Sequence, residues 1–278
     1  MKITEVSASF SGVIATGSYQ NIKPSYSMSV ELDSEDNAQK VFKSMRDMLR
    51  NIFKEEEQQA IVERIQKERE DLRFLPSPKT GKLLPSVTSI INYDADFFVS
   101  PQDLTQYCSQ GNCIDARVKH FVKTGEWVAA KDIKDLWTDI VILTKGSLKL
   151  PLDVGDFPGF IEKYPLNALE VGERFFNDEL GFTGETDLMG IPNKIKDALD
   201  IPTVFDVKRT PSKISNGLQL SAYCRNYGFK QGIIIPLSDK TGQGFSKPVI
   251  YNEESLNGYF KMFKLSRRTL RKDILYEK

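Results

Sequence analysis

A continuous apolar run constrains the fold of this chain more than any other feature. Gly232-Ile-Ile-Ile-Pro-Leu237 presents no polar side chain to water, which is typical of a strand covered on both faces. Thr203–Lys208 is rich in β-branched residues and predicts another strand. A helical pattern from Pro211 to Tyr227 lies between the two. The order strand, helix, strand predicts an α/β protein.

Further patterns extend this sheet. Leu169–Phe176 and Thr183–Met189 have the composition of two strands joined by a turn at 177–181, and Glu253–Lys272 has the pattern of a terminal helix. A further helix is expected over about 101–124. The sequence therefore predicts a mixed central sheet that is flanked by helices.

The N-terminal part has a different organisation. Apolar residues alternate with polar ones in Val6–Phe10 and again in Tyr26–Leu32, which predicts a hairpin with one buried face. An amphipathic stripe from Val41 to about Leu72 predicts one or two helices. Prolines and a glycine make 75–85 resemble a linker. We expect a hairpin-and-helix module over 1–78 and a main domain over 79–278, with 1–75 available to a protein partner.

Composition limits the classes of protein that remain. The 38 basic and 38 acidic residues balance, which excludes a broadly basic nucleic-acid coat but permits a local basic groove. The 40% of hydrophobic residues exclude a wholly disordered chain. No apolar run reaches the length of about 18 residues that a membrane helix needs. Glu5 lies where a signal peptide would have its apolar stretch. We therefore expect a cytoplasmic protein of a bacterium or a phage-infected cell, without membrane association.

The cysteines are too few for a disulfide framework. Cys108 and Cys113 are five residues apart and His120 follows, but no second pair of cysteines accompanies them. Reduced thiols are favoured over a zinc or iron–sulfur site, and His120 is left out of the expected site.

Acidic residues at the predicted strands indicate metal chemistry. Asp187 and Asp206 lie near the ends of neighbouring strands, where their carboxylates can converge on one hard cation such as Mg²⁺. Lys208 follows Asp206 by two residues and shares its strand face. An ammonium there can position an attacking water and offset the charge that builds on a phosphate. Gln219 and Tyr223 share one helix face and can point toward the same place.

An Asp-x-Lys triplet alone is common by chance. The ordered set is more specific: Gly184-Glu-Thr-Asp187, then Asp206-Val-Lys208 in a β-branched strand, then Gln219 and Tyr223 on a helix. This set resembles the PD-(D/E)XK nuclease superfamily, and within it the RecB-like branch with its phage and mitochondrial-type exonucleases. The resemblance covers about 84–265 and includes an opening segment, Leu84–Ile91. It implies a restriction-endonuclease-like core and an Mg²⁺- or Mn²⁺-dependent nuclease.

The resemblance also assigns roles to residues. It makes Asp187 and Asp206 metal ligands, adds the backbone carbonyl of Val207, and gives Lys208 the task of orienting the hydrolytic water. It places Gln219 and Tyr223 beside the site, in contact with DNA. Glu173 is a candidate outer-sphere or second-metal ligand, with Glu170 or a plain exposed acid as equal rivals, and Glu185 is treated as peripheral.

One position departs from the pattern of the family. Asp115 lies in Gly111–Asp115, where the family has a metal-ligating histidine. An aspartate oxygen can replace an imidazole on Mg²⁺ or Mn²⁺ and alter the metal preference. The alternative is a lost ligand and a descendant that only binds DNA.

Basic side chains are expected to hold the phosphates of double- or single-stranded DNA. They follow the predicted catalytic strand and crowd the terminal helix, where a solvated amphipathic helix is an equal alternative. The residues chosen for this role are Arg209, Lys213, Arg267, Arg268 and Arg271.

The leading hypothesis is a metal-dependent deoxyribonuclease, an exonuclease acting in recombination, repair or phage DNA metabolism. A restriction-type endonuclease on the same fold is the nearest competitor. A binding module that keeps the fold without turnover, with 1–75 recruiting a partner, is the alternative from another class.

Salt dependence tests the terminal helix. If its bases contact phosphates, raising the salt concentration from about 50 to 200 mM should weaken DNA binding steeply, because each contact releases counterions. Replacing Arg267 and Arg268 by glutamine should make the slope of log affinity against log salt shallower by about 1–2, as measured by fluorescence anisotropy. An unchanged slope would leave these residues as part of a solvated helix.

Overall fold

The computed structural model describes residues 3–17, 20–33, 35–68, 72–93, 101–133, 136, 150–238 and 240–275. The chain divides into two compact units: Met1–Leu83 with Arg268–Lys278, and Leu84–Arg267. The division predicted at 78/79 remains a prediction. Among the described residues, no helix is long and apolar enough to cross a membrane.

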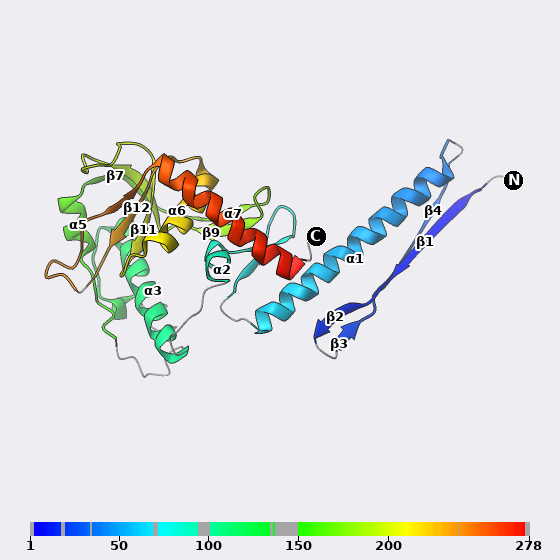
Figure 1. Ribbon diagram of the computed structural model, residues 1–278, viewed down its shortest axis with the longest axis horizontal. Coiled ribbons are helices and arrows are strands. Elements are labelled where there is room, and N and C mark those ends of the chain that lie inside the picture. Colours follow the sequence, from blue (N-terminus) through cyan, green and yellow to red (C-terminus); the bar gives the residue numbers. More distant parts are fainter. Residues whose placement is uncertain are drawn as a thin grey trace. The chain divides into compact units, whose positions relative to one another are not determined.

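The larger unit is built on a mixed sheet of five strands (Figure 1). The strand order is β13 (Val249–Tyr251), β12 (Gly232–Pro236), β11 (Thr203–Lys208), β10 (Leu188–Pro192) and β7 (Leu166–Val171). β11 and β12 run parallel, and the other neighbours are antiparallel. The predicted α/β class with a mixed central sheet is confirmed, whereas β13 had no clear signal in the sequence.

Helices cover both faces of the sheet. Phe205, Val207 and Ile233 on one face join a buried cluster with side chains of α3 (Pro101–Thr124) and α5 (Phe157–Lys163). On the other face, α6 (Lys213–Tyr227) packs against β11 and β12. All five residues of β12 are buried, as the apolar run predicts. The described part of this unit also contains α2 (Val87–Asn92), the 3-10 helix η1 (Ala130–Asp132) and the start of α7 (Glu253–Leu275), which extends past Arg267.

Two predicted strands are broken into four. Instead of strands over 169–176 and 183–189, the chain forms β7, β8 (Arg174–Asn177), β9 (Phe182–Glu185) and β10. β8 and β9 form a separate hairpin around the expected turn. The breaks fall at Gly172 and Thr186, which lie so close together that a β-carbon on Gly172 would overlap the Thr186 side chain and carbonyl. A close tertiary approach therefore overrides the local strand pattern.

The smaller unit contains the predicted hairpin. β1 (Glu5–Ser11) pairs antiparallel with β4 (Ser25–Glu31), and Ala8 packs on Met45 and Leu49 of α1 (Ala38–Glu68). The amphipathic stripe forms one helix of 31 residues. The connection between β1 and β4 holds a second small hairpin, β2 (Ile14–Gly17) with β3 (Gln20–Ile22).

The segment expected to be a linker is partly ordered. β5 (Phe74–Pro76) and β6 (Leu83–Pro85) form a two-stranded sheet. Ser77 N–H and the carbonyl of Lys82 form a hydrogen bond of 2.8 Å at its turn. The prolines and the glycine of this segment therefore mark the turn and the strand ends rather than an extended linker.

The approach of Gly172 to Thr186 can be tested by adding one methyl group. Gly172→Ala should lower the free energy of unfolding by about 1–3 kcal/mol, because backbone must move to make room. Gly111→Ala is the matched control, since this glycine lies in α3 with nothing within 4 Å of the added carbon; it should raise stability by about 0.5–1 kcal/mol. Urea unfolding measures the free energy of unfolding of both variants. Equal stabilities would contradict the close approach of Gly172 to Thr186.

Candidate metal centre

The candidate site begins where β10 separates from β11. Leu188 opposite Phe205 is the last ladder pair at this end. Beyond it, the Val207 N–H donates to Asp187 Oδ2 at 2.8 Å, so that the side chain of Asp187 takes the place of a strand neighbour. The Gly172 N–H donates to the Asp187 carbonyl at 2.9 Å. Asp187 is thus held by hydrogen bonds on both its backbone and its carboxylate. We call this point of strand separation, between Asp187 and residues Asp206–Lys208 of β11, the fork.

Asp206 is the most deeply buried charged residue of the fork. Its side chain is 0% exposed, and its Oδ2 lies 2.6 Å from Lys208 Nζ. Apart from this ion pair, neither carboxylate oxygen has a hydrogen-bond partner among the described residues. Burial raises the pKa of Asp206 to about 7; the Lys208 ammonium opposes that shift, and the Asp187 carboxylate adds to it. The raised pKa therefore indicates that the positive charge of Lys208 only partly offsets the cost of burying the Asp206 carboxylate.

Lys208 responds to the same surroundings with the opposite sign. Burial lowers its pKa, but the carboxylates of Asp206 and Asp187 outweigh burial, and the net pKa of Lys208 is raised. The ammonium therefore stays protonated at neutral pH. Its side chain is 29% exposed, so one end of this otherwise buried pair is open to solvent.

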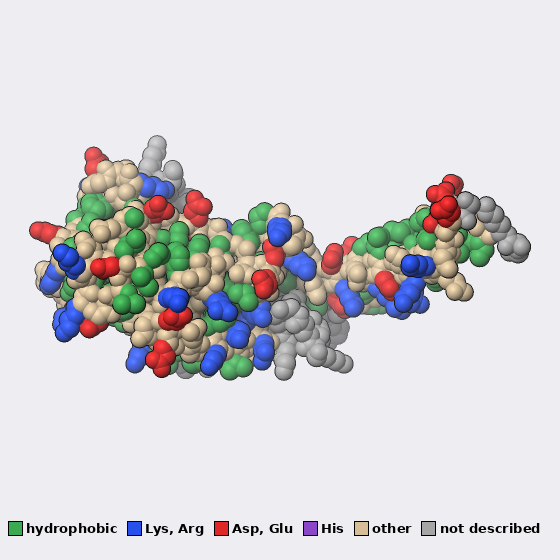
Figure 2. Space-filling view, turned by 90° about the horizontal axis from the view of Figure 1, so that it is seen from above, with side chains coloured by type: hydrophobic (Ala, Val, Ile, Leu, Met, Phe, Trp, Pro, Cys, Tyr) green, Lys and Arg blue, Asp and Glu red, His purple; other side chains and the backbone are tan. Residues whose placement is uncertain are grey.

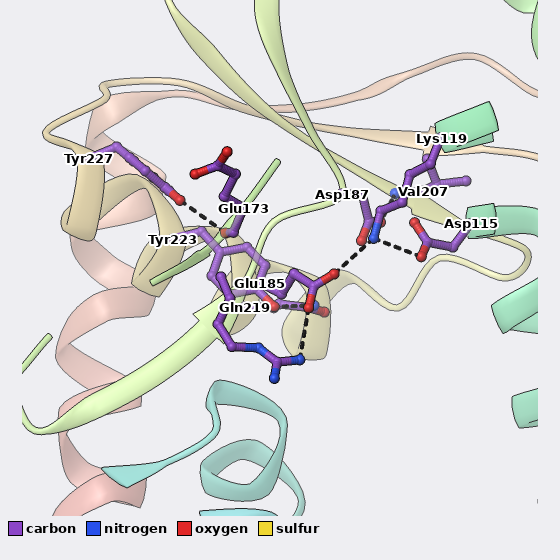
Figure 3. Close-up of polar contacts among 10 residues, drawn as sticks. Asp115, Lys119, Glu173, Glu185, Asp187, Val207, Gln219, Tyr223 and Tyr227 are labelled. Carbon is purple, nitrogen blue, oxygen red and sulfur yellow. Dashed lines mark hydrogen bonds and ion pairs between the residues drawn. The ribbon is translucent and has the colours of Figure 1, made fainter. Parts of the chain in front are cut away.

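Asp115 reaches the fork from α3. Lys119 Nζ lies 2.9 Å from Asp115 Oδ2 and 3.0 Å from Glu185 Oε1, and links the two carboxylates (Figure 3). Asp115 Oδ1 is buried without a hydrogen-bond partner. Burial raises the pKa of Asp115 to about 6, Asp187 adds to the shift, and Lys119 opposes it. Three aspartates, on α3, on β11 and in the connection between β9 and β10, therefore interact electrostatically.

These residues suit a hard divalent cation. The unpartnered oxygens of Asp206 and Asp115 are buried acceptors that a cation would satisfy, and oxygen ligands are those that Mg²⁺ and Mn²⁺ prefer. The Val207 carbonyl shares a strand edge with its N–H and so lies on the Asp187 side of β11. Within the described ranges, no three His, Cys, Asp or Glu side chains are close enough together, as they lie, to hold a metal ion. Some of these side chains would therefore have to change rotamer when a metal ion binds.

Gln219 and Tyr223 lie on the α6 side of the fork. Gln219 Nε2 donates to Tyr223 Oη at 3.0 Å, as their spacing on one helix face predicts. Tyr223 is 3% exposed. Burial raises its pKa well above the usual value, and the Asp206 carboxylate adds to the shift. Gly184 makes room for the ring, since a β-carbon there would lie 2.7 Å from Tyr223 Cε1.

The other acidic candidates are placed differently. Glu173 is exposed in the turn after β7, and its carboxylate points away from Asp115 and Asp187 in Figure 3. Glu170 is exposed on β7, opposite Met189. Neither is brought to the fork. Glu185, which we expected to be peripheral, is connected to Asp115 through Lys119. It also forms an ion pair with Arg174, with 2.9 Å between Glu185 Oε2 and Arg174 Nη2.

Sequence reasoning missed Lys119 and Arg174. The four-residue spacing of Asp115 and Lys119 on one helix face was an available signal, but the pairing with Glu185 joins residues 66 positions apart. The thiols of Cys108, Cys113 and Cys224 are free. His120 lies on α3 one residue beyond Lys119, half-buried.

The predicted DNA-binding bases differ in their exposure and in the part of the chain that carries them. Lys213 is exposed at the start of α6, Arg209 is half-buried after β11, and Arg267 is half-buried on α7. Arg268 is exposed, whereas the side chain of Arg271 lies outside the described part. On the face drawn in Figure 2, basic and acidic side chains are interspersed.

The raised carboxyl pKa values predict how stability depends on pH. Folded Asp206 and Asp115 have pKa values of about 7 and 6, against 3.8 as the usual value. Between these values the folded protein binds protons that the unfolded chain has lost, so the free energy of unfolding should fall as pH rises from about 4 to 8. In EDTA, the melting temperature should be lower at pH 8 than at pH 5, and Mg²⁺ or Mn²⁺ should restore it.

Asp206→Asn should remove most of this decline, because the amide does not ionise. Glu170→Gln, which changes an exposed carboxylate on β7, should retain it. Differential scanning calorimetry of the three proteins provides the comparison. A wild-type melting temperature that rises steadily from pH 5 to 8 would contradict the assignment of Asp206.

Comparison with known proteins finds distant structural likeness. No protein-family model and no curated protein matches the chain. The crystal structure of an alkaline exonuclease (LHK-Exo) from Laribacter hongkongensis is similar at a TM-score of 0.31 and 10% identity, covering 60% of this chain and 89% of that one. The crystal structure of SSO0001 is similar at a TM-score of 0.21 and 10% identity, covering 64% and 83%. Likeness this distant carries no assignment, so function must be argued from the fork itself.

Proposed function

We propose that this protein is a divalent-metal-dependent DNA nuclease with a restriction-endonuclease-like core. One observation carries the proposal: Asp206 is fully buried at a fork between strands, and Lys208 is the only partner of its oxygens among the described residues. A buried carboxylate that lacks hydrogen bonds costs several kcal/mol. Such a cost indicates a functional site.

The chain offers a set of oxygen ligands around this carboxylate. Asp206, Asp187, Asp115 and the Val207 carbonyl would hold the Mg²⁺ or Mn²⁺ ion. That ion, when bound, supplies Lewis-acid polarisation of a phosphoryl oxygen and a water of lowered pKa. The protonated Lys208, partly open to solvent, would orient the attacking water and offset negative charge on the phosphate.

Two features beside the fork favour an anionic substrate. β11 ends at Lys208 and α6 begins at Lys213, so the N-terminal end of this 15-residue helix follows directly after the site. Helix N-termini present free N–H groups and a positive dipole end to phosphates. Lys213 is exposed there. A phosphodiester backbone suits this combination of a cation site, a lysine and a helix N-terminus.

Within the nuclease class, we propose an exonuclease that acts in recombination, repair or phage DNA metabolism, with Gln219 and Tyr223 contacting DNA beside the site. An endonuclease of the restriction type would use the same fork. A non-catalytic DNA-binding protein, with 1–75 recruiting a partner, would retain the ligands without turnover. The choice among them depends on what the purified protein does to DNA.

Cleavage assays with single substitutions test the proposal. With Mg²⁺ or Mn²⁺, Asp206→Asn and Lys208→Met should each reduce the rate of hydrolysis of linear DNA by about 10²–10³-fold or more, because each removes a preorganised charge from the reacting centre. Glu170→Gln and Lys196→Met are the matched controls, since both change exposed charged residues outside the fork. They should cleave at the wild-type rate.

The substrates then separate the alternatives. Linear, circular and single-stranded DNA, with either end labelled, should show loss of linear substrates only; nicked circles would indicate an endonuclease. Equal activity in wild type and Asp206→Asn would overturn the proposed site. Binding of DNA by the wild type with no cleavage in Mg²⁺, Mn²⁺ or Co²⁺ would favour the non-catalytic alternative.

A further inference from the structure

Lys119 is held between two carboxylates at the edge of the fork. Its ammonium lies 2.9 Å from Asp115 Oδ2 and 3.0 Å from Glu185 Oε1, and its side chain is 19% exposed. Arg174 Nη2 holds the second oxygen of Glu185 at 2.9 Å. Figure 3 shows Asp115, Lys119 and Glu185 with the contacts that join them.

This arrangement is balanced in charge. Two carboxylates, Asp115 and Glu185, meet two cations, Lys119 and Arg174. At the other end of the fork, Asp187 and Asp206 have one ion-pair partner, Lys208, among the described residues. The uncompensated negative charge therefore lies beside Asp206, and none is left between Asp115 and Glu185.

The position of the Lys119 ammonium is also that of a bridging cation. Hydrolases with two metal ions hold them about 3.5–4 Å apart with carboxylates between them. A divalent ion that took the place of the ammonium would form bonds of about 2.1 Å to the same oxygens, with water molecules as its other ligands. The lysine already provides a positive charge there, on a side chain anchored in α3.

We propose that Lys119 takes the place of a second metal ion, so that the centre binds one divalent cation per chain. This inference rests on the proposed metal centre and adds its stoichiometry. Lys119 is a positioning residue: it holds Asp115 through Oδ2, which leaves Oδ1, the oxygen without a partner, to face the single ion.

Manganese binding to the full chain tests the inference directly. Metal-free wild type should bind one Mn²⁺, counted by equilibrium dialysis, and its electron paramagnetic resonance spectrum should show an isolated ion. Lys119→Met should bind two, with the spectrum of a spin-coupled pair. Lys119→Met with Glu185→Gln should return to one ion, because the second ion loses one of its two carboxylate ligands. Lys123→Met, one helical turn further along α3 and exposed, should behave as wild type.

The number of bound ions distinguishes failure of this inference from failure of the metal centre. Two ions in the wild type, or one ion in Lys119→Met, would overturn the inference while leaving the metal centre in place. No ion in the wild type would overturn the metal centre and with it the proposed function. Lys119→Gln removes the charge but keeps a hydrogen-bond donor; it should also bind two ions, and it replaces the methionine variant if that variant does not fold.

Discussion

The buried ion pair of Asp206 and Lys208 is the interaction on which the rest of the site depends. Burial of a charged pair is costly, and one partner that lacks further hydrogen bonds makes it more so. Apolar packing on both faces of β11 and β12 stabilises the larger unit and offsets this cost. β10 leaves β11 at this point, and Asp187 replaces the missing strand neighbour. The fork therefore exists because a side chain, rather than a strand, continues the pairing.

The electrostatics of the fork follow from its position in the fold. Asp115 lies on α3, Asp206 on β11 and Asp187 in the connection between β9 and β10, so tertiary packing brings their charges together. Burial raises the pKa of Asp206 and of Asp115, and Asp187 adds to both shifts. Lys208 compensates part of this charge at one end, and Lys119 does so at the other. The balanced net charge of the whole chain thus hides an excess of negative charge at one buried place.

The sequence predicted the elements that carry the site better than their junctions. β11, β12, α3 and α6 have strong period or composition signals, and they lie where the patterns indicated. The spacing of Gln219 and Tyr223 predicted their shared helix face. The strand breaks at Gly172 and Thr186 were missed, because they arise from a close approach of two chain segments. The contact between Lys119 and Glu185 was missed for a similar reason, since it joins residues 66 positions apart.

The central claim is that Asp206 lies at a metal centre. A crystal structure of the protein grown with Mn²⁺, with anomalous diffraction data, tests it most directly. The account predicts one anomalous peak at the fork, about 2.1 Å from an Asp206 oxygen, with Asp187, Asp115 or the Val207 carbonyl completing its inner ligands. Full manganese occupancy at another place, with Asp206 still bound only to Lys208, would contradict it.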